Sequence, residues 1–129
     1  MDHLSSRTQR WQPAGAEHFT GEVWLSDLGQ MPDASGLTML GVQFAPGART
    51  DWHSHPFGQT LYVVSGSGIV CDRDGERVVV GPGDVVQTPP GVVHWHGARP
   101  DAPMLHLSLT TGGATEWEPD RVDDAEYEG

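Results

Sequence analysis

The stretch GARTDWHSHPFGQTLYVVSG, residues 47–66, holds the residues on which the fold and the chemistry of this chain depend. Side chains two residues apart on a strand point to the same face, so His53 and His55 project together. Two imidazoles held side by side form half of a metal site, and Gln59, at the start of the next expected strand, can add a third ligand. The rest of the chain must then supply a fourth.

A second pair of histidines lies on one face of a later strand, in VVHWHGA at residues 92–98. His94 and His96 repeat the two-residue spacing of the first pair, and His106 is a fifth candidate on the strand that follows. A single histidine on a strand is more often a hydrogen-bonded structural residue than a ligand. Two such pairs with a fifth histidine nearby reverse that expectation and predict a metal site built from several strands.

The expected ligand types limit the choice of metal. Imidazole binds Mn, Fe, Co, Ni, Cu and Zn, whereas the amide oxygen of Gln59 is a hard ligand that suits an octahedral Mn or Fe site better than tetrahedral zinc. We therefore expect one divalent transition metal, with manganese first and iron, nickel, cobalt or zinc as the alternatives. Because histidine and glutamine are neutral, the uncompensated charge of the metal would attract an anionic ligand or a deprotonated small-molecule substrate.

The runs between these motifs predict an all-β protein with a single domain. The chain has 129 residues with 17 Gly and 10 Pro, which suits a turn-rich fold. No window longer than two turns has a helical period, and Asp74-Gly75 between two β-prone runs is typical of a hairpin. We expect a small antiparallel β-barrel or jelly roll over residues 18–112, with strands at 19–26, 37–45, 60–64, 69–72, 76–80, 84–88, 92–96 and 104–110.

Polar segments flank this barrel at both ends of the chain. Residues 1–17 are expected to form a loosely packed arm anchored by Trp11. Residues 113–129 form an acidic C-terminal segment, expected to be largely solvated and pinned to the barrel by Trp117. Asp123 and Glu126 have the spacing of a helix cap with a reciprocal acid, which predicts one short helical turn.

The charge of the chain excludes several functions. The net charge is −11 and all seven basic residues are arginines, which argues against binding to nucleic acid. The absence of lysine excludes a Schiff-base mechanism or a covalent pyridoxal phosphate linkage, because both require a primary amine.

The remaining features of the composition bear on location. Cys71 is the only cysteine, so no disulfide forms within the chain, and a small structural residue is the expected role of this thiol. No run approaches ~20 apolar residues, and the first residues lack the hydrophobic core of a signal peptide. A cytoplasmic protein with no membrane partner is the expectation.

The two histidine motifs resemble those of the cupin superfamily. The first cupin motif, Gly-x5-His-x-His-x3-(Glu/Gln)-x6-Gly, is matched at every position by Gly47, His53, His55, Gln59 and Gly66. The second, Gly-x5-Pro-x-Gly-x2-His-x3-Asn, is matched by Gly83, Pro89, Gly91 and His94, with Ala98 where Asn is usual. The resemblance implies a small antiparallel barrel, usually a homodimer, with a metal held in its mouth by His53, His55, Gln59 and His94.

A narrower resemblance extends over most of the chain from residue 19 onward. Residues 47–61, the run HWHGA at 94–98, His106 and the tail residues 116–117 and 124–127 look like those of small bacterial manganese-dependent hydroxynitrile lyases. These enzymes cleave cyanohydrins to a carbonyl compound and cyanide, or run the reverse addition. The resemblance implies that three side chains shape the substrate pocket: Leu40, Val42 and Thr110.

The same resemblance implies catalytic roles for three residues. The metal would bind the substrate hydroxyl and lower its pKa. A neutral imidazole of His106 or His96, beside the metal and not on it, would take the hydroxyl proton and later protonate cyanide. Thr50 would hydrogen-bond the leaving group or orient a water.

Two other functions fit the same ligands. An Fe(II)-dependent dioxygenase can use three histidines with open positions for substrate and O2. A non-catalytic binding or sensing module could hold a sugar or an organic acid in the barrel. The sequence therefore predicts a metal-dependent cupin, with a lyase-like enzyme as the first choice and these two functions as alternatives.

Overall fold

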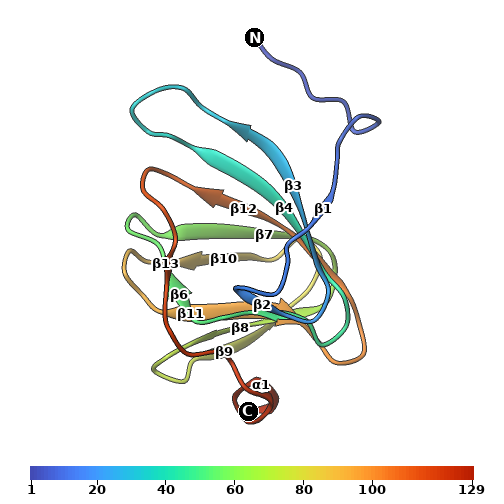
Figure 1. The fold of residues 1–129 in the computed structure, drawn as a ribbon, viewed down its shortest axis with the longest axis vertical. Helices are drawn as coiled ribbons and strands as arrows, with labels where there is room; N and C mark the ends of the chain where they lie inside the picture. Colours follow the sequence, from blue (N-terminus) through green and yellow to red (C-terminus); the bar gives the residue numbers. More distant parts are fainter.

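The computed structural model describes all residues from 1 to 129, and its regular secondary structure is almost entirely β-strand, with one short helix (Figure 1). Every pairing between strands is antiparallel. The elements are β1 (Gln12–Pro13), β2 (Phe19–Thr20), β3 (Val23–Gln30), β4 (Thr38–Phe44), β5 (Arg49–Thr50), β6 (His53–Ser54), β7 (Gln59–Gly66), β8 (Gly68–Asp72), β9 (Arg77–Val80), β10 (Val85–Thr88), β11 (His94–Ala98), β12 (Met104–Thr110), β13 (Glu116–Trp117) and α1 (Asp124–Glu128).

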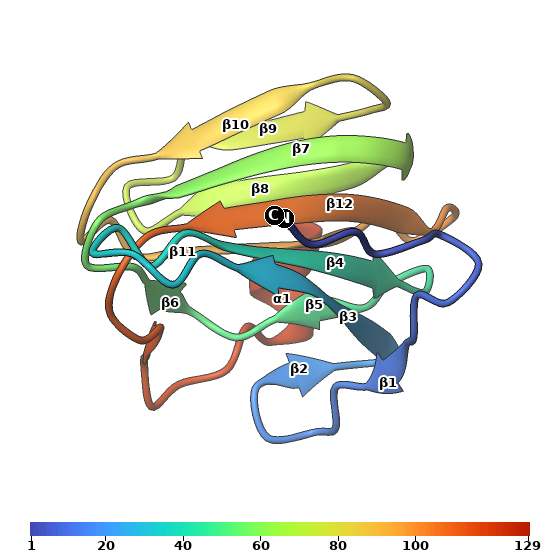
Figure 2. The same cartoon turned by 90° about the horizontal axis from the view of Figure 1, so that it is seen from above.

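Two curled sheets face each other and enclose the interior of the barrel (Figures 1 and 2). The first sheet has the order β1-β3-β4-β12-β7-β10, and the second has the order β13-β6-β11-β5-β2, with β8 pairing β11 and β9 pairing β8. The expected all-β antiparallel barrel is therefore confirmed.

The alternation along β12 shows how the sequence pattern divides core from surface. Met104, His106 and Ser108 are buried, whereas Leu105 and Leu107 between them are only partly buried. Successive side chains on a strand point to opposite faces, so the polar His106 and Ser108 face the interior with Met104. A histidine placed there cannot be a surface residue, and its polar atoms must find partners inside the barrel.

Two apolar clusters stabilise the barrel, one inside it and one on its outer side. One lies between the sheets and is built around Phe44, Val63 and Met104. The other contains Trp95, Val122 and Tyr127 and joins the C-terminal residues to the outer side of the second sheet.

The acidic C-terminal segment packs against the barrel more closely than its composition predicts. The expected helical turn is present as α1, and the side chains of Asp123 and Glu126 each accept a hydrogen bond from the other residue's backbone N–H. Tyr127 donates its hydroxyl to the carbonyl oxygen of Ala98, at 2.6 Å. Buried Arg49 donates two hydrogen bonds to the carbonyl oxygen of Val122, so the tail is held by specific contacts despite its charge.

The N-terminal arm leaves the barrel and lies largely in solvent (Figure 1). Its last residues form β1, which pairs with β3, and Trp11 lies directly over Gly41. A Cβ atom on Gly41 would lie 2.8 Å from the indole ring, so only glycine allows this approach. The fold has no helix that combines the length and the apolar character needed to cross a membrane.

Candidate metal centre and active site

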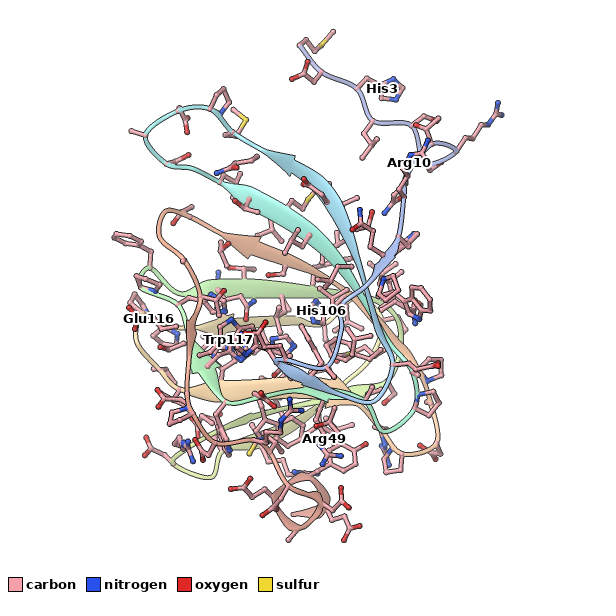
Figure 3. The ribbon with its side chains drawn as sticks, in the orientation of Figure 1. His3, Arg10, Arg49, His106, Glu116 and Trp117 are labelled. Atoms are coloured by element: carbon pink, nitrogen blue, oxygen red, sulfur yellow. The ribbon has the colours of Figure 1, made fainter.

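Strand pairing brings the distant histidines of the two motifs together. His94 of β11 lies directly opposite His53 of β6, and Gln59 is the first residue of β7 in the other sheet. The five histidines expected on strands and Gln59 are all at least 93% buried, but His55 lies just after the end of β6 and not on the strand. Figure 3 shows His106 between the sheets, whereas His3 lies on the N-terminal arm away from the barrel.

The imidazole rings form one continuous cluster. The ring centroids of His53 and His94 are 4.4 Å apart, and those of His53 lie 5.1 Å from both His55 and His96. One ligand atom from each of His53, His94 and His96 lies within 4.8 Å of the others, so these three histidines could hold a metal ion. The ring of His55 also belongs to the cluster, with its centroid 5.6 Å from that of His94.

Backbone carbonyls orient two of these rings. Nδ1 of His53 lies 2.9 Å from the carbonyl oxygen of Asp51, and Nδ1 of His94 lies 2.9 Å from that of Val92. A carbonyl only accepts, so Nδ1 must carry the proton in both rings. The opposite nitrogen, Nε2, then keeps its lone pair, which is the protonation state that a metal-binding histidine requires.

Ser108 orients the amide of Gln59. The Nε2 atom of Gln59 donates to the hydroxyl of Ser108 at 2.8 Å, which turns Oε1 of Gln59 toward Nε2 of His94 at 3.0 Å. With the proton of His94 on Nδ1, the 3.0 Å contact brings two lone pairs together, and a cation between them would relieve the repulsion. Two ligand atoms each about 2.1 Å from one ion can lie about 3.0 Å apart, so Oε1 of Gln59 and Nε2 of His94 are close enough to bind the same cation.

His106 forms a hydrogen bond with His96, which also belongs to the group of three histidines that could hold a metal. Nε2 of His106 lies 3.1 Å from Nδ1 of His96, which leaves Nε2 of His96 and Nδ1 of His106 without a partner in the protein. Nε2 of His55 is also buried without a partner. Burying three imidazole nitrogens without partners destabilises the folded protein unless a ligand or a metal binds them.

Burial keeps the histidines neutral at physiological pH. Desolvation lowers the pKa of His106 and of His55 to about 4, and it lowers the pKa of His53 and His96 well below the usual value for histidine, with neighbouring histidines adding to the effect. Desolvation also lowers the pKa of His94. Neutral imidazole is the form that binds metals and accepts protons.

One cavity of about 170 Å³ opens onto the cluster. The expected metal ligands, catalytic residues and pocket residues all line this cavity except His94. The side chain of His94 faces Gln59. No Asp, Glu, Arg or Lys contributes to the lining. The lining residues are Phe19, Leu25, Leu40, Val42, Thr50, His53, His55, Gln59, His96, His106, Ser108, Thr110, Thr115 and Trp117.

Several residues of this cavity were not assigned a role from the sequence. Ser108 was in phase with His106 on the same strand, and that alternation could have identified it. Trp117 also lines the cavity, and its ring stacks at 4.1 Å and an interplanar angle of 2° on that of His18, which lies behind it and comes from the other end of the chain. No local pattern predicts a contact between residues so far apart in sequence.

Comparison with known proteins identifies the family. The family model described as "Cupin domain" matches residues 41–110. The chain belongs to the cupins. The family membership expected from the two histidine motifs is thus confirmed.

This cupin has relatives that are named as enzymes. It is 44% identical over 115 residues to the (R)-mandelonitrile lyase of Granulicella tundricola, and the match covers 87% of each chain. It is also 32% identical over 77 residues to gentisate 1,2-dioxygenase from a Ralstonia species, across 59% of this chain and 22% of the dioxygenase. These names favour an enzymatic activity for this cupin.

Solved structures support the same fold. A cupin-like protein from Thermotoga maritima is 38% identical, with a TM-score of 0.87 and coverage of 98% of this chain and 96% of that one. The polyketide cyclase RemF from Streptomyces resistomycificus is 21% identical, with a TM-score of 0.74 and coverage of 99% and 91%. The second likeness concerns the fold alone.

Proposed function

We propose that this cupin is a metal-dependent hydroxynitrile lyase that cleaves a small, uncharged cyanohydrin to a carbonyl compound and cyanide, or runs the reverse addition. The observation that carries the proposal is the hydrogen-bonded His96–His106 pair in a cavity without charged side chains, where His96 adjoins His53 and His94 in a group of three histidines that could hold a metal. The high identity to a mandelonitrile lyase supports the same reaction.

The proposed ligands are His53, His55, Gln59 and His94, and the proposed metal is manganese. The protonated Nδ1 atoms of His53 and His94, the orphaned Nε2 of His55 and the oriented Oε1 of Gln59 support this set. Four neutral ligands leave the positive charge of the metal available to lower the pKa of a bound hydroxyl group and stabilise the alkoxide.

The His96–His106 pair is the proposed base. Nε2 of His96 is buried without a partner and takes the hydroxyl proton. The Nδ1–H group of His96 donates a hydrogen bond to Nε2 of His106, 3.1 Å away, and this bond stabilises the imidazolium. The proton taken up at Nε2 of His96 is returned to cyanide as the carbon–carbon bond breaks.

Thr50 is the proposed contact to the leaving group. Its hydroxyl oxygen accepts the backbone N–H of His96 at 3.2 Å, which holds the side chain beside the base and leaves the hydroxyl proton to donate. Leu40, Val42 and Thr110 line the cavity and are the proposed determinants of substrate size.

A dioxygenase and a binding module remain the two alternatives, and the lining of the cavity favours the lyase over the first. Gentisate is a carboxylate, and an enzyme that selects an anionic substrate normally places Arg or Lys against it. The cavity contains neither residue. A binding module would not need His96 and His106 as proton acceptors beside the metal.

The wider setting of the enzyme is also a proposal. We propose a cytoplasmic location, which the single free Cys71 supports. We also propose a homodimer, which exposed apolar side chains on the outer face of the first sheet, such as Tyr62 and Val64, support. The proposed partner is a small-molecule substrate alone.

The test combines elemental analysis with two assays. Protein purified without added metal is analysed for its metal, and the Mn- and Fe-loaded forms are assayed for mandelonitrile cleavage and for O2 uptake with an enolic substrate. We expect bound metal, cyanide release and no O2 uptake. The His106→Ala variant should keep the metal and lose most cleavage; O2 uptake, absence of metal or full turnover by His106→Ala would contradict the proposal.

A further inference from the structure

A two-residue strand from the C-terminal segment closes one side of the cavity. Strand β13 pairs with β6 so that Trp117 lies opposite His53, and the N–H of Glu118 donates to the carbonyl oxygen of Trp52 at 2.9 Å. In Figure 3, Trp117 lies at the front of the barrel, in the same region as His106. Both residues line the same cavity, so the indole forms a wall of the site.

Two aromatic rings from the other end of the chain support Trp117. His18 stacks on the indole at 4.1 Å and 2°, and Phe19 packs its edge against it at 5.9 Å and 67°. Trp117 is also 4.9 Å from the ring of His53. We call Phe19 and Trp117, which both line the cavity, the aromatic wall.

Arg121 joins the two chain ends that build this wall. Its guanidinium donates to the carbonyl oxygen of Phe19 at 3.1 Å, to that of Glu17 at 3.0 Å and to that of Ala16. Bonds from one planar group to three carbonyls within a four-residue segment restrict the movement of residues 16–19 relative to the C-terminal segment. The aromatic wall is therefore held in place before a ligand binds.

We propose that Trp117, supported by Phe19, determines the specificity of this cupin by contacting an aromatic ring on the substrate. The inference rests on the proposed function and adds the residue that recognises the aryl group of an aromatic cyanohydrin such as mandelonitrile. The rings of Trp117 and His53 lie 4.9 Å apart and both residues line the cavity, so a substrate held next to the histidine cluster would lie within reach of the indole. Offset or edge-on contacts between aromatic rings then favour an aryl group over a saturated group of similar size.

The experiment compares mandelonitrile with its cyclohexyl analogue, which replaces the phenyl ring by a saturated ring. The variants are Trp117→Leu, Trp117→Phe and, as a matched control, Trp24→Leu, because Trp24 is a comparable tryptophan on the outside of the barrel with 40% of its surface exposed. For Trp117→Leu we expect kcat/KM to fall about threefold to tenfold for mandelonitrile and less than about twofold for the cyclohexyl analogue. Trp117→Phe and Trp24→Leu should keep the ratio of the wild-type protein.

If Trp117→Leu lowers kcat/KM equally for the two substrates, or lowers it for neither, the inference is overturned. If the wild-type protein releases no cyanide from either substrate, the proposed function fails, and the aromatic wall is tested by binding alone. Ligand-observed NMR with benzyl alcohol and cyclohexylmethanol then measures the preference. Weaker binding of benzyl alcohol by Trp117→Leu alone would support the aromatic wall, and equal binding of both alcohols by the wild-type protein would reject it.

Discussion

The Ser108→Ala substitution tests whether one hydroxyl group sets the ligand geometry of the metal centre. Ser108 accepts the amide N–H of Gln59 at 2.8 Å, and this bond turns Oε1 of Gln59 toward His94. An amide has two chemically different ends, so it binds a metal only through its oxygen. Without Ser108, the amide nitrogen loses its partner, and nothing else in the protein fixes which end faces the histidines.

Two effects of different size follow from this change. In the metal-free protein, a buried amide donor without a partner lowers the free energy of unfolding by about 1–3 kcal/mol. For metal binding, the loss of a group that orients a ligand weakens affinity by about 10–100-fold, which corresponds to about 1.4–2.7 kcal/mol. The second effect requires that Gln59 is a ligand, whereas the first does not.

Urea unfolding of the metal-free protein and chelator-competition titration of the metal separate the two effects. Ser26→Ala is the matched control, because the Ser26 hydroxyl is also buried but has no hydrogen-bond partner. We expect that control to change neither quantity beyond about 0.5 kcal/mol. If Ser108→Ala destabilises the fold but leaves metal affinity unchanged, Gln59 is not a ligand, and the assignment is wrong.

Two further predictions concern the histidines. His55→Ala should lose bound metal by elemental analysis, whereas His96→Ala should retain the metal and lose turnover; the reverse result would place His96, not His55, in the ligand set. For the metal-free protein, the pKa of His106 is held at about 4 by burial, against about 6.5 in the unfolded chain, so the unfolded state takes up the proton first as the pH falls. Stability should therefore be highest above pH 6.5 and fall toward pH 4 by about 1.4 kcal/mol per pH unit for each such histidine, and His106→Leu should reduce that slope in urea titrations at several pH values. A slope that His106→Leu leaves unchanged would show that His106 takes up its proton equally in both states.

Local patterns predicted much of this structure because the properties they encode are local. The two-residue period of β12 placed His106 and Ser108 on the buried face, as observed. The Asp123 and Glu126 spacing predicted the start of α1 for the same reason, since both partners of the capping box lie within one turn. By contrast, the acidic composition of the C-terminal segment gave no indication that Arg49 and Tyr127 attach it to the barrel.

The sequence by itself determined the family, most of the longer strands and which side chains on them face inward, because hydrophobic alternation and motif spacing are properties of neighbouring residues; it did not show that residues 19–26 divide into β2 and β3 or that the short strands β1, β5 and β13 form. Only the tertiary structure decided which atoms meet. It placed His53 opposite His94, paired His96 with His106 and set Ser108 against Gln59. It also stacked His18 on Trp117, a contact that depends on both chain ends reaching the same side of the barrel. Such contacts depend on how two sheets curl and close, and no local pattern in the sequence encodes that distance.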